Sequence, residues 1–381
     1  MNPFKRSKFL GRTFLLVILF ASSMGLLLMA PSFAASSNSL AGINKACALS
    51  SLPSTTLVSG PPTGAKSPDD LTIMAVRGLD NGNPLLWTEY QNGIDPDGTP
   101  GTPGGPTQST IAGYNLATGT LVMTIPVTGH VDGLTADPAL GALIATANED
   151  DNSNFNLVYP AFGAVATYIY SPNPAVESTG GTDSIAIVNG QMYVSHSNPL
   201  DTTQATTYRV TLDKNTLTAY LTPVFYDNSK AFDVNTFKIV QMALTDPDTN
   251  YLMPPTSPLF AGTLATISQG DGKIIFAAHP IVKPHLFVLS VTDNVPGNVP
   301  PIDGLAVATA SQGTLYIVDS KAQTISALNT EGCPTGTTFV GEPNDNSNPF
   351  IGTLNLLTGK IAPLGNSFMS PKGMLFVPAL D

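Results

Sequence analysis

An all-β ring of repeated blades, a β-propeller with six blades, is the fold that this sequence predicts. The main observation is a cassette in which a strand opening is followed by an apolar run, a turn and a second apolar run. Its clearest copies open with Val131-Asp132-Gly133-Leu134, Thr182-Asp183-Ser184-Ile185 and Ile302-Asp303-Gly304-Leu305. Such a repeat, at about 60 residues, is typical of radial β architectures. The composition agrees, because 34 glycines, 33 prolines and 42% hydrophobic residues predict many turns around a large core.

The number of cassettes sets the number of blades. Six cassettes start near Asp70, Asp132, Asp183, Gly262, Asp303 and Asn366. Residues 242–252 imitate a further cassette, which would make seven blades, but this stretch begins too close to Gly262 for a full blade. We therefore interpret residues 226–261 as an insertion.

A second repeat supports the same period. The segments Asn-Leu-Ala-Thr-Gly at 115–119 and Asn-Leu-Leu-Thr-Gly at 355–359 each join two apolar runs, and they are 240 residues apart, or four repeats. Each is predicted to be the turn of the outer hairpin of a four-stranded blade.

The two ends of the chain are predicted to close the ring. The last cassette has no residues after it to complete a blade, whereas residues 40–60 precede the first cassette. Strands from both termini in one blade would leave no free sheet edge. Cys47 and Cys333 would lie at this seam, and a disulfide between them would stabilise the fold by about 5 kcal/mol. Two unpaired buried thiols are the alternative.

The N-terminus predicts export. Lys5, Arg6, Lys8 and Arg12 precede an apolar run over residues 14–30, and small residues follow up to Ala34. Residues 1–34 are interpreted as a signal peptide and residues 35–381 as one secreted propeller domain, with an uncleaved signal anchor as the alternative. The remaining 12 basic and 27 acidic residues give a net charge of about −15. This charge disfavours nucleic acid and anionic membranes as partners.

Functional side chains are expected on one rim of the ring. The opening of the first strand and the end of the second strand of an antiparallel pair lie at the same end of the sheet. The residues at these places are Asp70, Glu89, His130, Asp132, Glu149, Asp150, Asp183, His196, His279, Asp303, Asp319 and Asn366. Long segments at 91–109 and 321–348 follow second strands and would add loops to the same rim.

Three roles are open for these polar groups. An aspartate at a strand opening can accept hydrogen bonds from neighbouring backbone N–H groups and so be structural. Aspartates and asparagines from several blades can together bind a cation such as calcium. His130, His196 and His279 can act as general bases or as metal ligands.

The cassettes resemble those of the NHL-repeat and gluconolactonase-like group of six-bladed propellers. The resemblance rests on the Asp-Gly-Leu openings, the Asp-Pro or Pro-x-Gly turns, and the Leu-Tyr-Ile-Val-Asp run at 315–319. It implies a divalent cation bound by strand-opening residues near the channel. The matching positions are Asp132, Asp183, Asp303 and Asn366. The family's ligating glutamate has no clear match, and only Asp70 or Glu89 could replace it.

The sequence therefore predicts an exported binding or scaffolding protein. Its acidic rim would take an extracellular ligand, either a protein or a carbohydrate. The alternative is a calcium-type, metal-dependent lactonase or esterase, in which the cation polarises a carbonyl and activates water.

Overall fold

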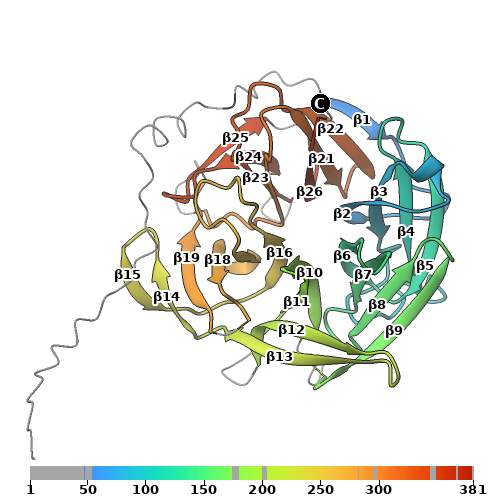
Figure 1. Ribbon diagram of the computed structural model, residues 1–381, viewed down its shortest axis with the longest axis horizontal. Coiled ribbons are helices and arrows are strands. Elements are labelled where there is room, and N and C mark those ends of the chain that lie inside the picture. Colours follow the sequence, from blue (N-terminus) through green and yellow to red (C-terminus); the bar gives the residue numbers. More distant parts are fainter. Residues whose placement is uncertain are drawn as a thin grey trace, which may run out of the picture. The chain divides into compact units, whose positions relative to one another are not determined.

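The computed structural model describes residues 47, 54–173, 180–199, 204–281, 283–293, 295, 298–343, 349–365 and 368–379. The predicted signal peptide and Asn366 lie outside the described residues. The described strands belong to the unit Gly42–Asp381 and, apart from one additional hairpin, form six four-stranded blades around a central channel (Figure 1). The prediction of a six-bladed β-propeller is confirmed.

Each of the first three blades is built from four consecutive strands, which follow one another from the channel outward. Blade 1 consists of β2 (Pro68–Ala75), β3 (Pro84–Tyr90), β4 (Gln108–Asn115) and β5 (Leu121–Thr128). Blade 2 consists of β6 (Val131–Asp137), β7 (Ala142–Ala147), β8 (Asn154–Tyr159) and β9 (Ala164–Ser171). Blade 3 consists of β10 (Thr182–Val188), β11 (Gln191–His196), β12 (Ala205–Asp213) and β13 (Thr218–Tyr226). The outer strands β9 and β13 pair in parallel, which joins blades 2 and 3 into one sheet.

Blade 4 corrects the predicted register of the fourth cassette. Its strands are β16 (Pro247–Leu252), β17 (Leu264–Ser268), β18 (Lys273–Ala278) and β19 (His285–Ser290). The strand after Gly262 is thus the second of its blade. The inner strand lies in residues 242–252, the stretch that resembled a further cassette and was predicted to be part of an insertion. The insertion proper is the hairpin of β14 (Lys230–Asp233) and β15 (Lys238–Gln241), which extends the outer edge of this blade. Eleven residues, 253–263, separate β16 from β17, so the usual short turn is absent.

The strands of blades 5 and 6 are not consecutive in the sequence. Blade 5 consists of β20 (Gly304–Val307), β23 (Thr338–Glu342), β24 (Phe350–Leu354) and β25 (Ile361–Gly365). Blade 6 consists of β26 (Pro371–Pro378), β21 (Gly313–Asp319), β22 (Thr324–Asn329) and β1 (Ser54–Val58). The fifth cassette is therefore not a hairpin, because its two strands belong to different blades. Residues 321–348 are not a loop either, because they contain β22 and β23.

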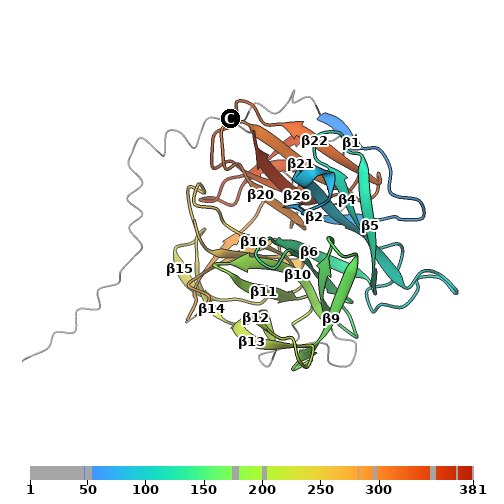
Figure 2. The ribbon, with the colours of Figure 1, turned by 45° about the vertical axis from the view of Figure 1, so that its right-hand side comes forward.

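Ring closure by both termini is confirmed. The first described strand, β1, pairs with β22, while the last strand, β26, pairs with β21 in the same blade (Figure 2). A disulfide joins Cys47, ahead of β1, to Cys333, between β22 and β23. The predicted outer hairpins are also confirmed as β4–β5 and β24–β25.

The core lies between neighbouring blades. Every residue of β7 is buried, and Trp87 of β3 packs with Met74 and Leu134 between blades 1 and 2. Among the described residues, 3-10 turns are found at Asp80–Gly82 and Gln269–Asp271. Within the described part of the chain, no helix has the length and apolar character that crossing a bilayer requires.

Candidate functional site at the acidic mouth of the channel

Six residues at one position of the six inner strands surround the same end of the channel, and we call them the mouth ring. They are Asp69, Asp132, Asp183, Asp248, Asp303 and Lys372. Each stands at or just before the start of β2, β6, β10, β16, β20 and β26, respectively. The ring thus presents five carboxylates and one ammonium group.

Close packing of the inner strands explains the glycine in the Asp-Gly-Leu openings. A Cβ atom on Gly133 would lie 2.6 Å from the carbonyl oxygen of Asp183, and one on Gly373 would lie 2.5 Å from that of Asp69. In blades 2, 5 and 6 the glycine after the ring position thus faces the next blade's ring carbonyl. In blade 4 Thr249 occupies this place, and its hydroxyl donates a hydrogen bond to the carbonyl of Asp303.

Lys372 lies between two carboxylates of the ring. Its Nζ is 2.8 Å from Asp69 Oδ2 and 3.2 Å from Asp303 Oδ2. Burial would lower the pKa of Lys372, but the charges of Asp303 and Asp69 raise that pKa well above its ordinary value. Lys372 is therefore a permanent cation within the mouth ring.

A second group of contacts surrounds Asp132. Gln91 Nε2 donates to Asp69 Oδ2 at 2.8 Å and to Asp132 Oδ1 at 2.6 Å. His130 Nε2 lies 3.5 Å from Asp132 Oδ1. Burial opposes protonation of His130, but its contact with Asp132 raises the pKa of His130 to about 9. Burial likewise opposes ionisation of Asp132, but His130 lowers the pKa of Asp132.

Carboxyl groups outnumber the basic groups at the mouth. The five ring aspartates interact electrostatically with Asp70, Glu89 and Glu149, and Lys372 and His130 lie among them. Burial, reinforced by neighbouring carboxylates, raises the pKa of Asp70 to about 7. For the same reasons the pKa values of Asp69, Glu89, Glu149, Asp183 and Asp248 are all raised. A crowd of acidic groups that resist full ionisation is therefore the electrostatic property of this site.

Two oxygens of these carboxylates find no hydrogen-bond partner. Glu89 Oε1 accepts the Asp70 backbone N–H at 2.5 Å, but Glu89 Oε2 is buried without a partner. Asp183 is 2% exposed, and its Oδ1 is likewise unpartnered. Buried polar atoms are usually hydrogen-bonded, so these two oxygens are exceptional within the site.

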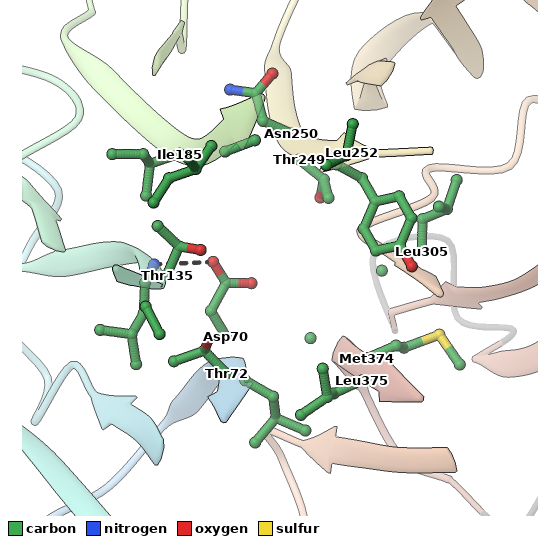
Figure 3. A pocket seen from close by; sticks show the side chains of 18 of the residues that line it. Asp70, Thr72, Thr135, Ile185, Thr249, Asn250, Leu252, Leu305, Met374 and Leu375 are labelled. Atoms are coloured by element: carbon green, nitrogen blue, oxygen red, sulfur yellow. Dashed lines mark hydrogen bonds between the residues drawn. The ribbon is translucent and has the colours of Figure 1, made fainter. Parts of the chain in front are cut away.

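A cavity of about 280 Å³ lies in the channel beside the ring (Figure 3). Its wall is partly apolar, with Leu134, Ile185, Leu305 and Met374 from four inner strands. Asp70 lines the cavity, and its Oδ2 accepts the backbone N–H of Leu134 at 3.1 Å. A ligand in this cavity would therefore contact apolar side chains and a carboxylate together.

The other predicted rim residues differ in their surroundings. Asp150 is exposed in the segment that follows β7. Asp319 accepts hydrogen bonds from the backbone N–H groups of Met369, Ser370 and Ala322, which is the structural role of a strand-end aspartate. His196 is fully buried beside Tyr208.

The placement of His279 on this rim is wrong. His279 follows β18, whose Ala278 pairs with His285 at the end of the blade opposite Asp248. The reason is that β18, the strand before His279, is the third strand of its blade and not the second, as predicted. It therefore runs in the opposite direction and ends on the other rim. The exposed rings of His279 and His285 lie 6.5 Å apart on that opposite rim.

Sequence reasoning missed Asp69, Asp248, Lys372 and Gln91. A signal was present for three of them, because Pro68-Asp69, Pro247-Asp248 and Pro371-Lys372 share a proline before the ring position. The segment Ser370-Pro371-Lys372-Gly373 resembled a turn, but it opens β26. Lys372 thus holds the ring position in blade 6.

Thermal stability is expected to fall as the pH rises. An acid with a raised folded-state pKa binds more protons in the folded state, so its destabilising effect is absent below about pH 4 and develops as the pH rises. For Asp70 this effect is complete above about pH 7. His130 adds to the fall, because its raised pKa stabilises the fold only while it is protonated, up to about pH 9. Melting temperatures against pH, with chelator present, measure this.

The variant Asp70→Asn should have a flatter melting profile between about pH 4 and pH 7. One such group changes stability by at most about 1.4 kcal/mol per pH unit. A profile that is independent of pH, or a slope unchanged in the variant, would contradict the assignment.

Comparison with known proteins finds solved structures of low similarity. No family model and no curated protein matches this sequence. Among solved structures, streptogramin B lyase is 10% identical over 84% of this chain and 87% of its own, with a TM-score of 0.41. The periplasmic gluconolactonase of Pseudomonas aeruginosa is 12% identical over 81% and 88%, with a TM-score of 0.45. A putative 6-phosphogluconolactonase from Bacteroides fragilis is 11% identical over 83% and 99%, with a TM-score of 0.42.

The class that the fold defines is the six-bladed β-propeller. The similar solved structures include gluconolactonase-like proteins, the group that the cassettes resemble. Strand pairing establishes the six blades, and the side-chain contacts of Lys372 establish the mouth ring.

Proposed function

We propose that this protein is an extracytoplasmic binding protein that takes a cationic group of its ligand into the mouth of the channel. The observation that carries this proposal is the excess of buried carboxylates around Lys372 and His130. Bringing carboxylates together in a poorly solvated site is costly, and a bound cation offsets that cost. A propeller mouth with this charge therefore favours cations over neutral or anionic ligands.

The cavity supports an organic cation with an apolar body. Leu134, Ile185 and Leu305 supply apolar surface, while Asp70 supplies a carboxylate at the same wall. Small-molecule sites commonly combine an apolar lining with a few polar groups that orient the ligand. The ammonium group of a free amine or of a lysine side chain on a partner protein has this chemistry.

The proposed location outside the cytoplasm rests on the disulfide and on the N-terminal sequence. Disulfides form and persist mainly in oxidising compartments, and the two cysteines of this chain are joined. The basic and apolar segments before Ala34 supply the export signal in this proposal.

Binding of amines tests the proposed function. Benzylamine is expected to raise the melting temperature of the purified protein, whereas benzyl alcohol, which has nearly the same shape and no charge, is not. Asp70→Asn should weaken amine binding about tenfold, because a charged hydrogen-bond partner is lost. Isothermal titration calorimetry measures both effects.

Asp213→Asn is the matched control, because it removes the same charge from an exposed turn of blade 3. Equal binding of amine and alcohol, or equal loss in both variants, would overturn the proposal. Chelator-sensitive hydrolysis of a lactone or ester would instead assign the protein as a metal-dependent hydrolase.

A further inference from the structure

His130, Asp132 and Glu149 form a group apart from the ion pairs of Lys372. One potential ligand atom from each residue can be chosen so that all three atoms lie within 4.8 Å of one another. His130 and Asp132 flank the start of β6, and Glu149 follows the end of β7, so one blade supplies all three. Two ligands of one tetrahedral zinc ion lie about 3.3 Å apart, close to the 3.5 Å between His130 Nε2 and Asp132 Oδ1.

The imidazole of His130 is oriented as in a metal ligand. Its Nδ1 lies 2.7 Å from the carbonyl oxygen of Ile94, so in the neutral ring Nδ1–H donates to that oxygen. The lone pair of Nε2 then faces Asp132. Histidines that bind metals commonly donate their other N–H to a backbone carbonyl in this way, which sets both tautomer and ring direction.

The backbone around these side chains is held in place. Asn148 Oδ1 accepts the backbone N–H of His130 at 2.9 Å, and Asn148 N–H donates to the His130 carbonyl at 2.7 Å. Ser197 of blade 3 donates its hydroxyl to the Glu149 carbonyl at 2.7 Å. Preorganised ligands of this kind bind a metal with little loss of conformational entropy.

Asp183 gives the second and independent indication of a ligand. Its carboxyl group lies against that of Asp132, close enough for a hydrogen bond between them, and it also interacts with Glu149. Yet its buried Oδ1 has no hydrogen-bond partner. Two carboxylates in contact need a proton or a cation between them, and the orphaned oxygen is a free donor for a cation.

We propose that His130, Asp132 and Glu149, with Asp183 as a fourth ligand, bind one divalent transition-metal ion of the zinc or manganese class. An imidazole among carboxylates is the ligand chemistry that such ions take, whereas calcium prefers a shell of oxygens alone. The three carboxylates also supply more than enough negative charge to neutralise a divalent ion. The site lies on the Asp132 side of the mouth ring, while Asp69 and Asp303 are paired with Lys372.

Metal titration of the purified, chelator-treated protein tests this proposal. Co²⁺ is the spectroscopic probe, and it should bind with a stoichiometry of one and give visible ligand-field bands that Zn²⁺ abolishes by competition. His130→Gln and Glu149→Gln should each weaken Zn²⁺ binding at least tenfold, as measured by calorimetry. The Glu149→Gln variant keeps the test valid if His130→Gln fails to fold, since Glu149 is only half-buried.

His285→Gln is the matched control, because it removes an exposed histidine beside His279 on the opposite rim. It should leave the affinity for Zn²⁺ unchanged. Absence of Co²⁺ or Zn²⁺ binding, affinity unaffected by His130→Gln and Glu149→Gln, or loss of binding in His285→Gln would each overturn the proposal. Amine binding is measured in the absence of metal. Failure of the amine-binding proposal can therefore be distinguished from failure of the metal-site proposal.

Discussion

Replacing Lys372 with methionine is expected to destabilise the protein by about 3 kcal/mol at neutral pH. The substitution keeps the bulk of the side chain but leaves Asp69 and Asp303, both about 4% exposed, without the ammonium group between them. Uncompensated buried charges are among the most destabilising changes that one substitution can make. The free energy of unfolding, taken from urea denaturation, measures the loss.

The pH dependence of this loss identifies its cause. Without Lys372, protonation of Asp69 and Asp303 removes the repulsion, so the difference between variant and wild type should be largest at neutral pH and shrink as the pH falls. Lys273→Met is the matched control, because Lys273 has similar exposure but lies near one carboxylate, that of Asp271 at 3.9 Å, and otherwise donates to the Ala243 carbonyl. That variant should lose less than about 1 kcal/mol. Equal losses in the two variants would contradict the role of Lys372.

Removing the disulfide with the double variant Cys47→Ser/Cys333→Ser is expected to cost about 5 kcal/mol. The two cysteines are 286 residues apart, and a loop of this size gives a large entropic effect on the unfolded chain. The urea midpoint of the double variant, compared with that of the oxidised wild type, measures the effect. Reduced wild type should match the variant.

The same variant should loosen the seam of the ring. Strand β1 is held to the ring through its pairing with β22 and through Cys47 just ahead of it. Amide exchange of residues 54–58 is therefore expected to accelerate more than that of β7, which is buried throughout. Unchanged exchange together with a loss of stability below about 1 kcal/mol would show that pairing with β22 is sufficient.

The local sequence pattern predicted those inner strands that form a short hairpin with the next strand of the chain. Asp132-Gly133-Leu134 and Asp183-Ser184-Ile185 open β6 and β10, and each strand turns directly into its neighbour. The glycine of the first motif also has a tertiary reason, since a side chain there would collide with the next blade. Repeated local geometry leaves a repeated sequence signal.

The pattern failed where strand pairing is non-local. The run at 315–319 follows β20 closely in sequence, but it pairs with β26, nearly 60 residues later. In blade 4 the long connection 253–263 hid the hairpin of β16 and β17. Spacing along the chain cannot distinguish a neighbouring strand from a strand that crosses to the next blade.

The candidate site was predicted in part. Asp132, Asp183 and Asp303 lie in the mouth ring, whereas Asn366 lies outside the described residues and Lys372 takes the ring position of that blade. A lysine after proline and before glycine looked like a turn. Its role depends on Asp69 and Asp303, which are about 300 and 69 residues away, so it is visible only in the folded ring.

By itself, the sequence determined a β-propeller with repeated acidic strand openings and two cysteines near its seam, because alternation, turns and repeats are local properties of the chain. The tertiary structure decided which strands share a blade, which histidine lies beside the acidic openings, and that one lysine completes the ring. These depend on contacts between residues far apart in sequence. Charge interactions in a buried site are set by such contacts rather than by neighbours along the chain.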